Sequence, residues 1–123
     1  MNNNPVVWFE IYVQEMERAR QFYETVFQTT LERLNNPDLE LWSFPMDMNS
    51  VGASGALVKM EGIPSGGAGT LVYFGCEDCA VEEARIVPAG GSIKQEKMSI
   101  GEYGFISLGF DSEGNLFGLH SMQ

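Results

Sequence analysis

Apolar and polar residues alternate or recur in patterns that predict two similar series of secondary-structure elements. Residues 6–13 alternate two sets of side chains, which is typical of a β-strand with one apolar face. From Glu15 onward, apolar residues recur at the spacing of one helix face. These positions are Met16, Ala19, Phe22, Tyr23, Val26 and Phe27. Three more strands are predicted over residues 29–34, 39–44 and 55–60. The first half therefore has the predicted order β-α-β-β-β.

The second half repeats this order after residues 62–69, a segment rich in glycine, proline and serine that we interpret as a linker. A strand over residues 70–76 precedes a helix for which Asp78 is the candidate N-cap. The last three strands are predicted over residues 92–98, 103–110 and 116–121. Similar residues of the two halves lie about 62 to 65 positions apart. We therefore expect one domain, residues 1–123, with repeat one at about 5–61 and repeat two at about 70–123.

Length and charge restrict the possible partners. A chain of 123 residues with 44% hydrophobic residues is long enough to bury a core without metals or disulfides. Its formal net charge of -10 repels phosphate backbones and anionic lipids, so we expect no nucleic-acid or membrane partner. The first apolar stretch is short and interrupted by Glu10, unlike a secretory signal or a membrane span. We therefore predict a cytoplasmic protein.

The two cysteines, Cys76 and Cys79, form a single Cys-Glu-Asp-Cys motif. Zinc would need further nitrogen or sulfur ligands at suitable spacing, and the only histidine, His120, lies far away in the sequence. A redox role would need a stabilised thiolate, which the two intervening acidic residues disfavour. We expect two reduced, half-buried thiols.

Two segments carry a resemblance to a known family. Residues 9–23 combine a strand, a polar corner and a helix with the pattern Arg-Ala-x-x-Phe-Tyr, and Asp111-x-Glu113-Gly114-Asn115 precedes the last strand. Both resemble the glyoxalase/bleomycin-resistance/dioxygenase superfamily, also called the vicinal oxygen chelate fold, over essentially the whole chain. The resemblance implies an α+β fold in which two βαβββ repeats form a curled mixed sheet around a cavity. It does not define a function, because the superfamily includes isomerases, dioxygenases and binding proteins.

The enzymes of that superfamily hold a divalent metal through four His, Glu or Gln side chains, one each from strands one, four, five and eight. The corresponding positions here are Trp8, Val58 or Lys59, Leu71 or Thr70, and Gly118. None of these supplies an imidazole or a carboxylate, whereas a divalent ion needs three or four such ligands. We therefore expect no metal and no other cofactor. Glu10 and His120 alone would make at best a weak metal site.

The period of two along each strand predicts which side chains share the cavity face. The expected ligand-binding residues are Trp8, Glu10, Tyr12, Tyr73, Gly118 and His120. A carboxylate among aromatic residues needs a partner, and His120, a basic residue or a cationic ligand would each serve Glu10. The alternatives are that the aromatic side chains simply fill a core and that Glu10 and His120 form a structural pair.

These expectations favour a homodimeric protein that binds a small neutral or cationic aromatic molecule without metal. One alternative is an enzyme, either a lyase or isomerase resembling lactoylglutathione lyase, or a metal-free catalyst with Glu10 and His120 as acid and base. Another is a protein with a filled cavity whose role is assembly alone.

Overall fold

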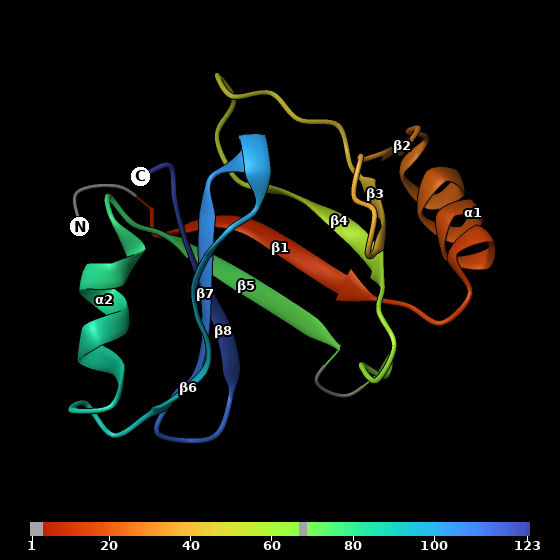
Figure 1. The fold of residues 1–123 in the computed structure, drawn as a ribbon. Helices are drawn as coiled ribbons and strands as arrows, with labels where there is room; N and C mark the ends of the chain where they lie inside the picture. The colour runs from red at the N-terminus through yellow and green to blue at the C-terminus, as the bar shows by residue number, and fades with distance from the viewer. Residues whose placement is uncertain (1–3, 67–68) are drawn as a thin grey trace. The chain divides into compact units, whose positions relative to one another are not determined.

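The computed structural model describes residues 4–66 and 69–123 and confirms the α+β class (Figure 1). The elements are β1 (Val6–Tyr12), α1 (Met16–Phe27), β2 (Glu32–Arg33), β3 (Glu40–Ser43), β4 (Ser54–Lys59), β5 (Thr70–Gly75), α2 (Cys79–Ile86), β6 (Ser92–Ser99), a short 3₁₀ helix η1 (Gly101–Tyr103), β7 (Phe105–Phe110) and β8 (Leu116–Ser121). The βαβββ order thus occurs twice. Residues 1–3 and two residues of the predicted linker, Gly67 and Ala68, lie outside the described residues.

One compact unit comprises Trp8–Leu71. Its strands follow the order β2-β3-β4-β1. The β1 and β4 strands are parallel, with Trp8 opposite Ser54 and Tyr12 opposite Val58. The other two pairs, β2–β3 and β3–β4, are antiparallel. Parallel strands need a long connection between them, and here α1, β2 and β3 lie between β1 and β4 in the chain.

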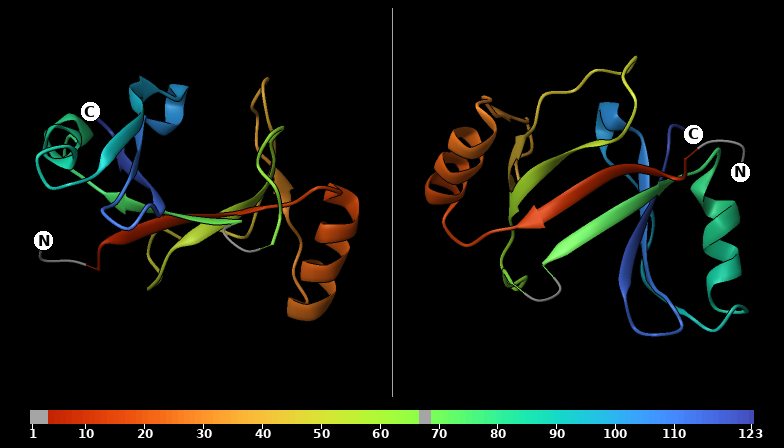
Figure 2. Two further views of the ribbon diagram at one scale, coloured as in Figure 1. Left: turned by 90° about the horizontal axis from the view of Figure 1, so that it is seen from below. Right: turned by 180° about the vertical axis from the view of Figure 1, so that it is seen from behind.

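The core of this unit lies between α1 and one face of its strands (Figure 2). Its buried members are Val13, Met16, Leu31 and Leu57, and Ile11, Ala19, Tyr23, Trp42 and Phe44 pack against them. The outer half of the predicted helical stripe is not buried, since Phe22, Val26 and Phe27 are 59%, 54% and 64% exposed. The stripe of α1 is therefore wider than the surface that it buries in this unit.

The other unit contains Val72–Gln123 together with residues 4–7. Its strand order is β5-β8-β7-β6, with β5 parallel to β8 and the remaining pairs antiparallel. The buried residues are Cys79, Ile86 and Leu119, and Phe74, Cys76, Ile93, Phe105 and Phe117 pack against them. This core lies beneath α2.

Two local sequence signals of this unit are confirmed. Asp78 is the N-cap of α2, and its carboxylate accepts a hydrogen bond from the Ala80 backbone N–H at 3.0 Å. In the turn between β7 and β8, Gly114 has φ of +83°, which a residue without Cβ adopts at little cost. Within the described residues, no helix is long and apolar enough to cross a membrane.

Candidate functional site

Trp8, Glu10 and Tyr12 lie on the face of β1 that is turned away from α1. Their neighbour Ile11 packs into the core beneath α1, and alternation along the strand places Glu10 and Tyr12 on the opposite face. The Trp8 indole N–H donates a hydrogen bond to Glu10 Oε2 at 3.3 Å, and the Tyr12 hydroxyl donates one to Oε1 at 2.8 Å. The carboxylate is thus held between two neutral aromatic donors, in a half-buried position.

Tyr73, Gly118 and His120 lie in the other unit, on the strand face opposite α2. Phe74 and Leu119, which alternate with them, pack beneath α2. Tyr73 is the direct partner of Gly118 in the β5–β8 register. A Cβ atom on Gly118 would lie 2.3 Å from Cδ1 of the Tyr73 ring. The room that the glycine leaves is therefore taken by Tyr73.

His120 forms a hydrogen bond within its own unit. Its Nε2 lies 2.6 Å from the backbone carbonyl oxygen of Tyr103, in η1. A carbonyl can only accept, so this nitrogen carries a proton and donates the hydrogen bond. Glu10 and His120 belong to different units, and their pairing stays a prediction.

The positions that correspond to the superfamily's metal ligands do not fit a metal ion. Trp8 offers an N–H donor rather than a lone pair, and Leu71 is 2% exposed. Val58 is fully buried and Gly118 is covered by Tyr73. Across the described residues, no three His, Cys, Asp or Glu side chains converge as a metal site. The donor set of these positions therefore lacks the imidazole and carboxylate groups that divalent ions prefer.

The two cysteines are unsuited to redox or nucleophilic chemistry. Both thiols are free, and Cys76 is half-buried as expected, but the same expectation is wrong for Cys79, which is fully buried because it lies in the hydrophobic core of its unit. Burial, followed by the negative charge of Glu82, raises the pKa of Cys76 to about 11. A thiol with such a pKa is protonated at neutral pH and reacts slowly.

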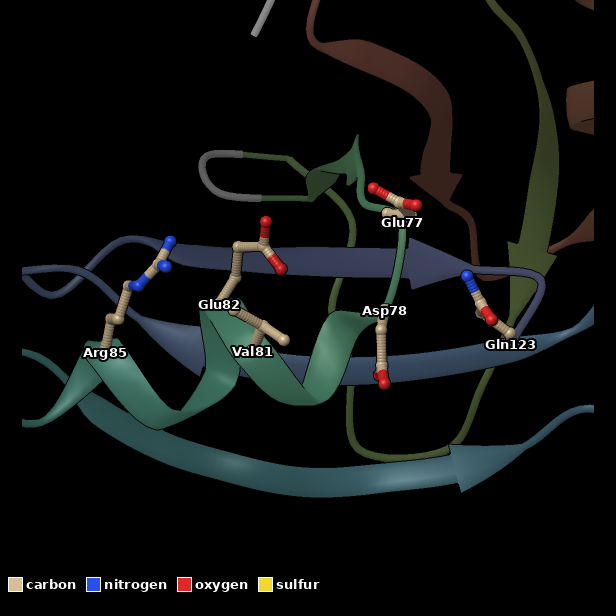
Figure 3. Close-up of a pocket in the computed structure, with 6 residues that line it drawn as sticks. All are labelled: Glu77, Asp78, Val81, Glu82, Arg85 and Gln123. Atoms are coloured by element: carbon tan, nitrogen blue, oxygen red, sulfur yellow. The ribbon is translucent and has the colours of Figure 1, made fainter.

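A groove along α2, the α2 groove, is a feature that the sequence analysis missed (Figure 3). It consists of two adjoining hollows of about 310 and 330 Å³ that share Glu82 and Arg85 in their walls. The first is lined by Glu77, Asp78, Val81 and Gln123, and the apolar lining of the second includes Ile86, Phe110, Phe117 and Leu119. In the sequence, the charges of this helix are indistinguishable from an ordinary solvent-exposed face.

Comparison with known proteins gives a family and a shared fold. The family model described as Glyoxalase/Bleomycin resistance protein/Dioxygenase superfamily matches residues 6–119. A methylmalonyl-CoA epimerase variant from Streptomyces coelicolor, in complex with 2-nitronate-propionyl-CoA, has a TM-score of 0.68 and 16% identity over 96% of this chain and 94% of that chain. The methylmalonyl-CoA epimerase from Mycobacterium tuberculosis has a TM-score of 0.70 and 15% identity, covering 97% of this chain and 88% of that chain.

A hypothetical protein from Bacillus halodurans has a TM-score of 0.72 and 11% identity over 96% of this chain and 94% of that chain. At these identities the similarities show the fold alone. A sequence search of curated proteins finds no match.

Proposed function

Because this chain belongs to the glyoxalase/bleomycin resistance/dioxygenase superfamily, we propose that it binds a small neutral or cationic molecule with a flat apolar part, without a metal ion. The observation that carries this proposal is the placement of Glu10. Its carboxylate accepts hydrogen bonds from Trp8 and Tyr12 on a strand face that no helix of its unit covers.

Two properties of this face favour the proposed ligand class. Trp8 is half-buried and offers stacking and cation–π contacts of about 1 kcal/mol, whereas Tyr12 is only 8% exposed and contributes mainly its hydrogen bond to Glu10. Glu10 supplies a negative centre that attracts an amine and repels a carboxylate or phosphate. In the same unit, the guanidinium of Arg20 lies over Trp42 in the core beneath α1, on the other face of the strands. This arginine is therefore not available to an anion at Glu10.

The test compares three ligands that share one ring system and differ in charge: naphthylmethylamine, naphthoate and naphthyl phosphate. We expect the amine to raise the melting temperature most and to bind with the lowest Kd by calorimetry. Glu10→Gln should weaken binding of the amine by more than about tenfold. Preference for either anion, or an unchanged Kd in Glu10→Gln, would overturn the proposal.

The chain provides a matched control variant. In β3, the Trp42 indole N–H donates to Glu40 Oε2 at 3.1 Å, the same tryptophan–glutamate arrangement two residues apart as in β1. Trp42 lies in the core beneath α1, on the other side of the strands. Glu40→Gln should therefore leave the Kd of naphthylmethylamine unchanged. An equal loss in both variants would mean that the effect comes from the protein's stability.

Metal independence is part of the proposal and has its own test. Elemental analysis after purification without chelator, followed by titration with zinc, nickel and manganese, should give no stoichiometric ion, because the donor set at Trp8, Leu71 and Gly118 does not fit one. One tightly bound ion per chain would contradict the proposed metal-free binding protein and favour a metal-dependent lyase or isomerase.

An isomerase is the second candidate, favoured by the full-length fold similarity to the two methylmalonyl-CoA epimerases. Methylmalonyl-CoA, with and without added manganese, is the direct probe. If the protein only binds a ligand, methylmalonyl-CoA should not be epimerised with or without manganese. Turnover without metal that is lost in Glu10→Gln and in His120→Ala would establish the acid–base enzyme instead.

We also propose that the protein is a homodimer, since closed two-fold pairing is the commonest assembly of such domains. Sedimentation equilibrium at about 20 μM protein should give twice the mass of the chain. A monomer at that concentration would exclude a stable dimer.

A further inference from the structure

Helix α2 carries a glutamate and an arginine that face one groove without pairing to each other. Figure 3 shows Glu82 and Arg85 projecting from the same side of the helix. In α1, Glu17 and Arg20 have the same three-residue spacing and form an ion pair at 3.2 Å. Within residues 4–66 and 69–123, Arg85 forms neither an ion pair nor a side-chain hydrogen bond. The three-residue spacing alone therefore does not explain why Glu82 and Arg85 form no ion pair in the described residues.

Glu82 lies near a group other than Arg85. Its carboxylate lies beside the Cys76 thiol, and its negative charge is one of the causes that raise the pKa of that thiol. One carboxylate oxygen of Glu82, Oε1, is buried and has no hydrogen-bond partner. A buried carboxylate oxygen without a donor is unfavourable, since it has lost water without gaining a replacement. A ligand donor in the groove, met by a small rotation of the carboxylate, would remove this deficit.

The groove provides an apolar surface next to these two charges. In the second hollow, Ile86 and Leu119 are 8% and 5% exposed and form a buried floor. Phe110 and Phe117 line the same hollow and are half-buried. Hollows of about 300 Å³ are at the lower end of the size range of small-molecule sites. The apolar end therefore has room for one side chain of moderate size.

The charges around the groove select between ligand classes. Arg85 opposes a simple amine, while Glu77 and Asp111 oppose a simple carboxylate. Asp78 is already paired with Lys97 Nζ at 2.8 Å and adds less to the local field. A molecule that carries both an ammonium and a carboxylate offers a group of opposite charge to Glu82 and to Arg85 at once.

We propose that the α2 groove is a second binding site, distinct from the Glu10 face, for a zwitterionic small molecule with an apolar side chain, of the α-amino acid class. The ammonium group binds Glu82, the carboxylate binds Arg85 through its guanidinium, and the apolar side chain lies against Phe110 and Phe117.

The probes are L-phenylalanine, phenethylamine and 3-phenylpropionate, which present both charges, the amine alone and the acid alone. Titration of the ¹⁵N-labelled full chain should give saturable shifts of backbone amides in α2 and β8 with L-phenylalanine. Read from the amides of α2, each single-charge analogue should bind the groove more than about tenfold more weakly, whatever phenethylamine does at the Glu10 face. With L-phenylalanine, saturable shifts confined to residues outside α2, or no saturable shifts, would overturn the proposal.

The variants separate this site from the rest of the molecule. Glu82→Gln and Arg85→Gln should each raise the Kd of L-phenylalanine by about tenfold or more. Glu17→Gln, which removes the acid of a closed pair in α1, and Glu10→Gln, which alters the other proposed site, should leave it unchanged. Arg85 is exposed, so its variant remains a test even where Glu82→Gln unfolds. An unchanged Kd of L-phenylalanine in both Glu82→Gln and Arg85→Gln would overturn the assignment of these two residues, whatever Glu10→Gln does to binding at the Glu10 face.

Discussion

Tyr73 and Gly118 are direct partners in the parallel pair β5–β8, and the Tyr73 ring lies where a side chain on Gly118 would begin. A Cβ at Gly118 would lie 2.3 Å from Cδ1 and 2.4 Å from Cε1 of the ring, closer than any ordinary contact. Gly118 corresponds to the strand-eight glutamate that the family resemblance implies for metal-binding enzymes. The aromatic ring therefore excludes that ligand on steric grounds as well as by residue type.

Gly118→Ala should lower the free energy of unfolding by about 1–3 kcal/mol, because the new methyl group overpacks against the Tyr73 ring. Urea unfolding of the wild type and the variant measures the change. The matched control is the same substitution in a Tyr73→Leu background, where a flexible side chain replaces the ring and the loss should be smaller. An equal loss in both backgrounds would show that the ring is not the obstacle.

Arg20→Met should destabilise the protein by about 1–2 kcal/mol, since Arg20 combines a cation–π contact with two ion pairs. Its guanidinium carbon lies 3.6 Å from the Trp42 ring centroid, and its side chain is only 20% exposed. Arg18→Met is the control, because the side chains of its ion pair with Glu15 are 76% and 67% exposed. That variant should lose less than about 0.5 kcal/mol. Chemical denaturation of both variants decides, and equal losses would contradict the assignment.

The β7–β8 turn should contribute to loss of stability in acid through Asp111. Hydrogen bonds from the backbone and side chain of Asn115 hold the pKa of Asp111 below its ordinary value. A carboxyl group with a lowered pKa in the folded state stabilises the fold above its ordinary pKa of about 4 and loses this contribution as the pH falls through the folded value. Asp111→Asn should therefore flatten the decline in stability below about pH 4.

Urea unfolding at several pH values measures this slope. Asp38→Asn serves as the control, because the Asp38 carboxylate is exposed and accepts no hydrogen bond from the described residues. An acid slope that is identical in wild type and Asp111→Asn would exclude a role for the turn.

Cys76 should react with iodoacetamide roughly 100-fold more slowly at pH 8 than an unperturbed thiol, because its pKa of about 11 leaves little thiolate. The rate, followed by mass spectrometry, should still rise up to about pH 11. Glu82→Gln should accelerate the reaction, since removing a nearby negative charge lowers the pKa of a thiol. The urea-unfolded chain provides the reference rate. Fast alkylation of the folded protein at pH 7 would restore the redox interpretation of the Cys-Glu-Asp-Cys motif.

Most of the fold could be predicted from local patterns. Alternation defined β1, the N-cap Asp78 marked the start of α2, and the turn at Asp111–Asn115 separated β7 from β8. Each of these signals involves residues close in sequence, whose backbone conformation depends on their own neighbours. Alternation also gave the common face of Trp8 and Glu10, since side chains two residues apart on a strand point the same way. Their role in ligand binding stays a proposal.

What the amino-acid sequence determined by itself was the order of the elements, the family and the absence of metal-ligand residue types at the corresponding positions. Tertiary packing alone decided which side chains are paired. Glu82–Arg85 and Glu17–Arg20 have the same spacing, yet within the described residues only the second forms an ion pair, and the Glu82 carboxylate lies near the Cys76 thiol. Likewise, the Tyr73 ring occupies the space beside Gly118 only because β5 and β8, which are distant in sequence, lie side by side. Side-chain partners depend on such non-local neighbours, which short-range patterns do not contain.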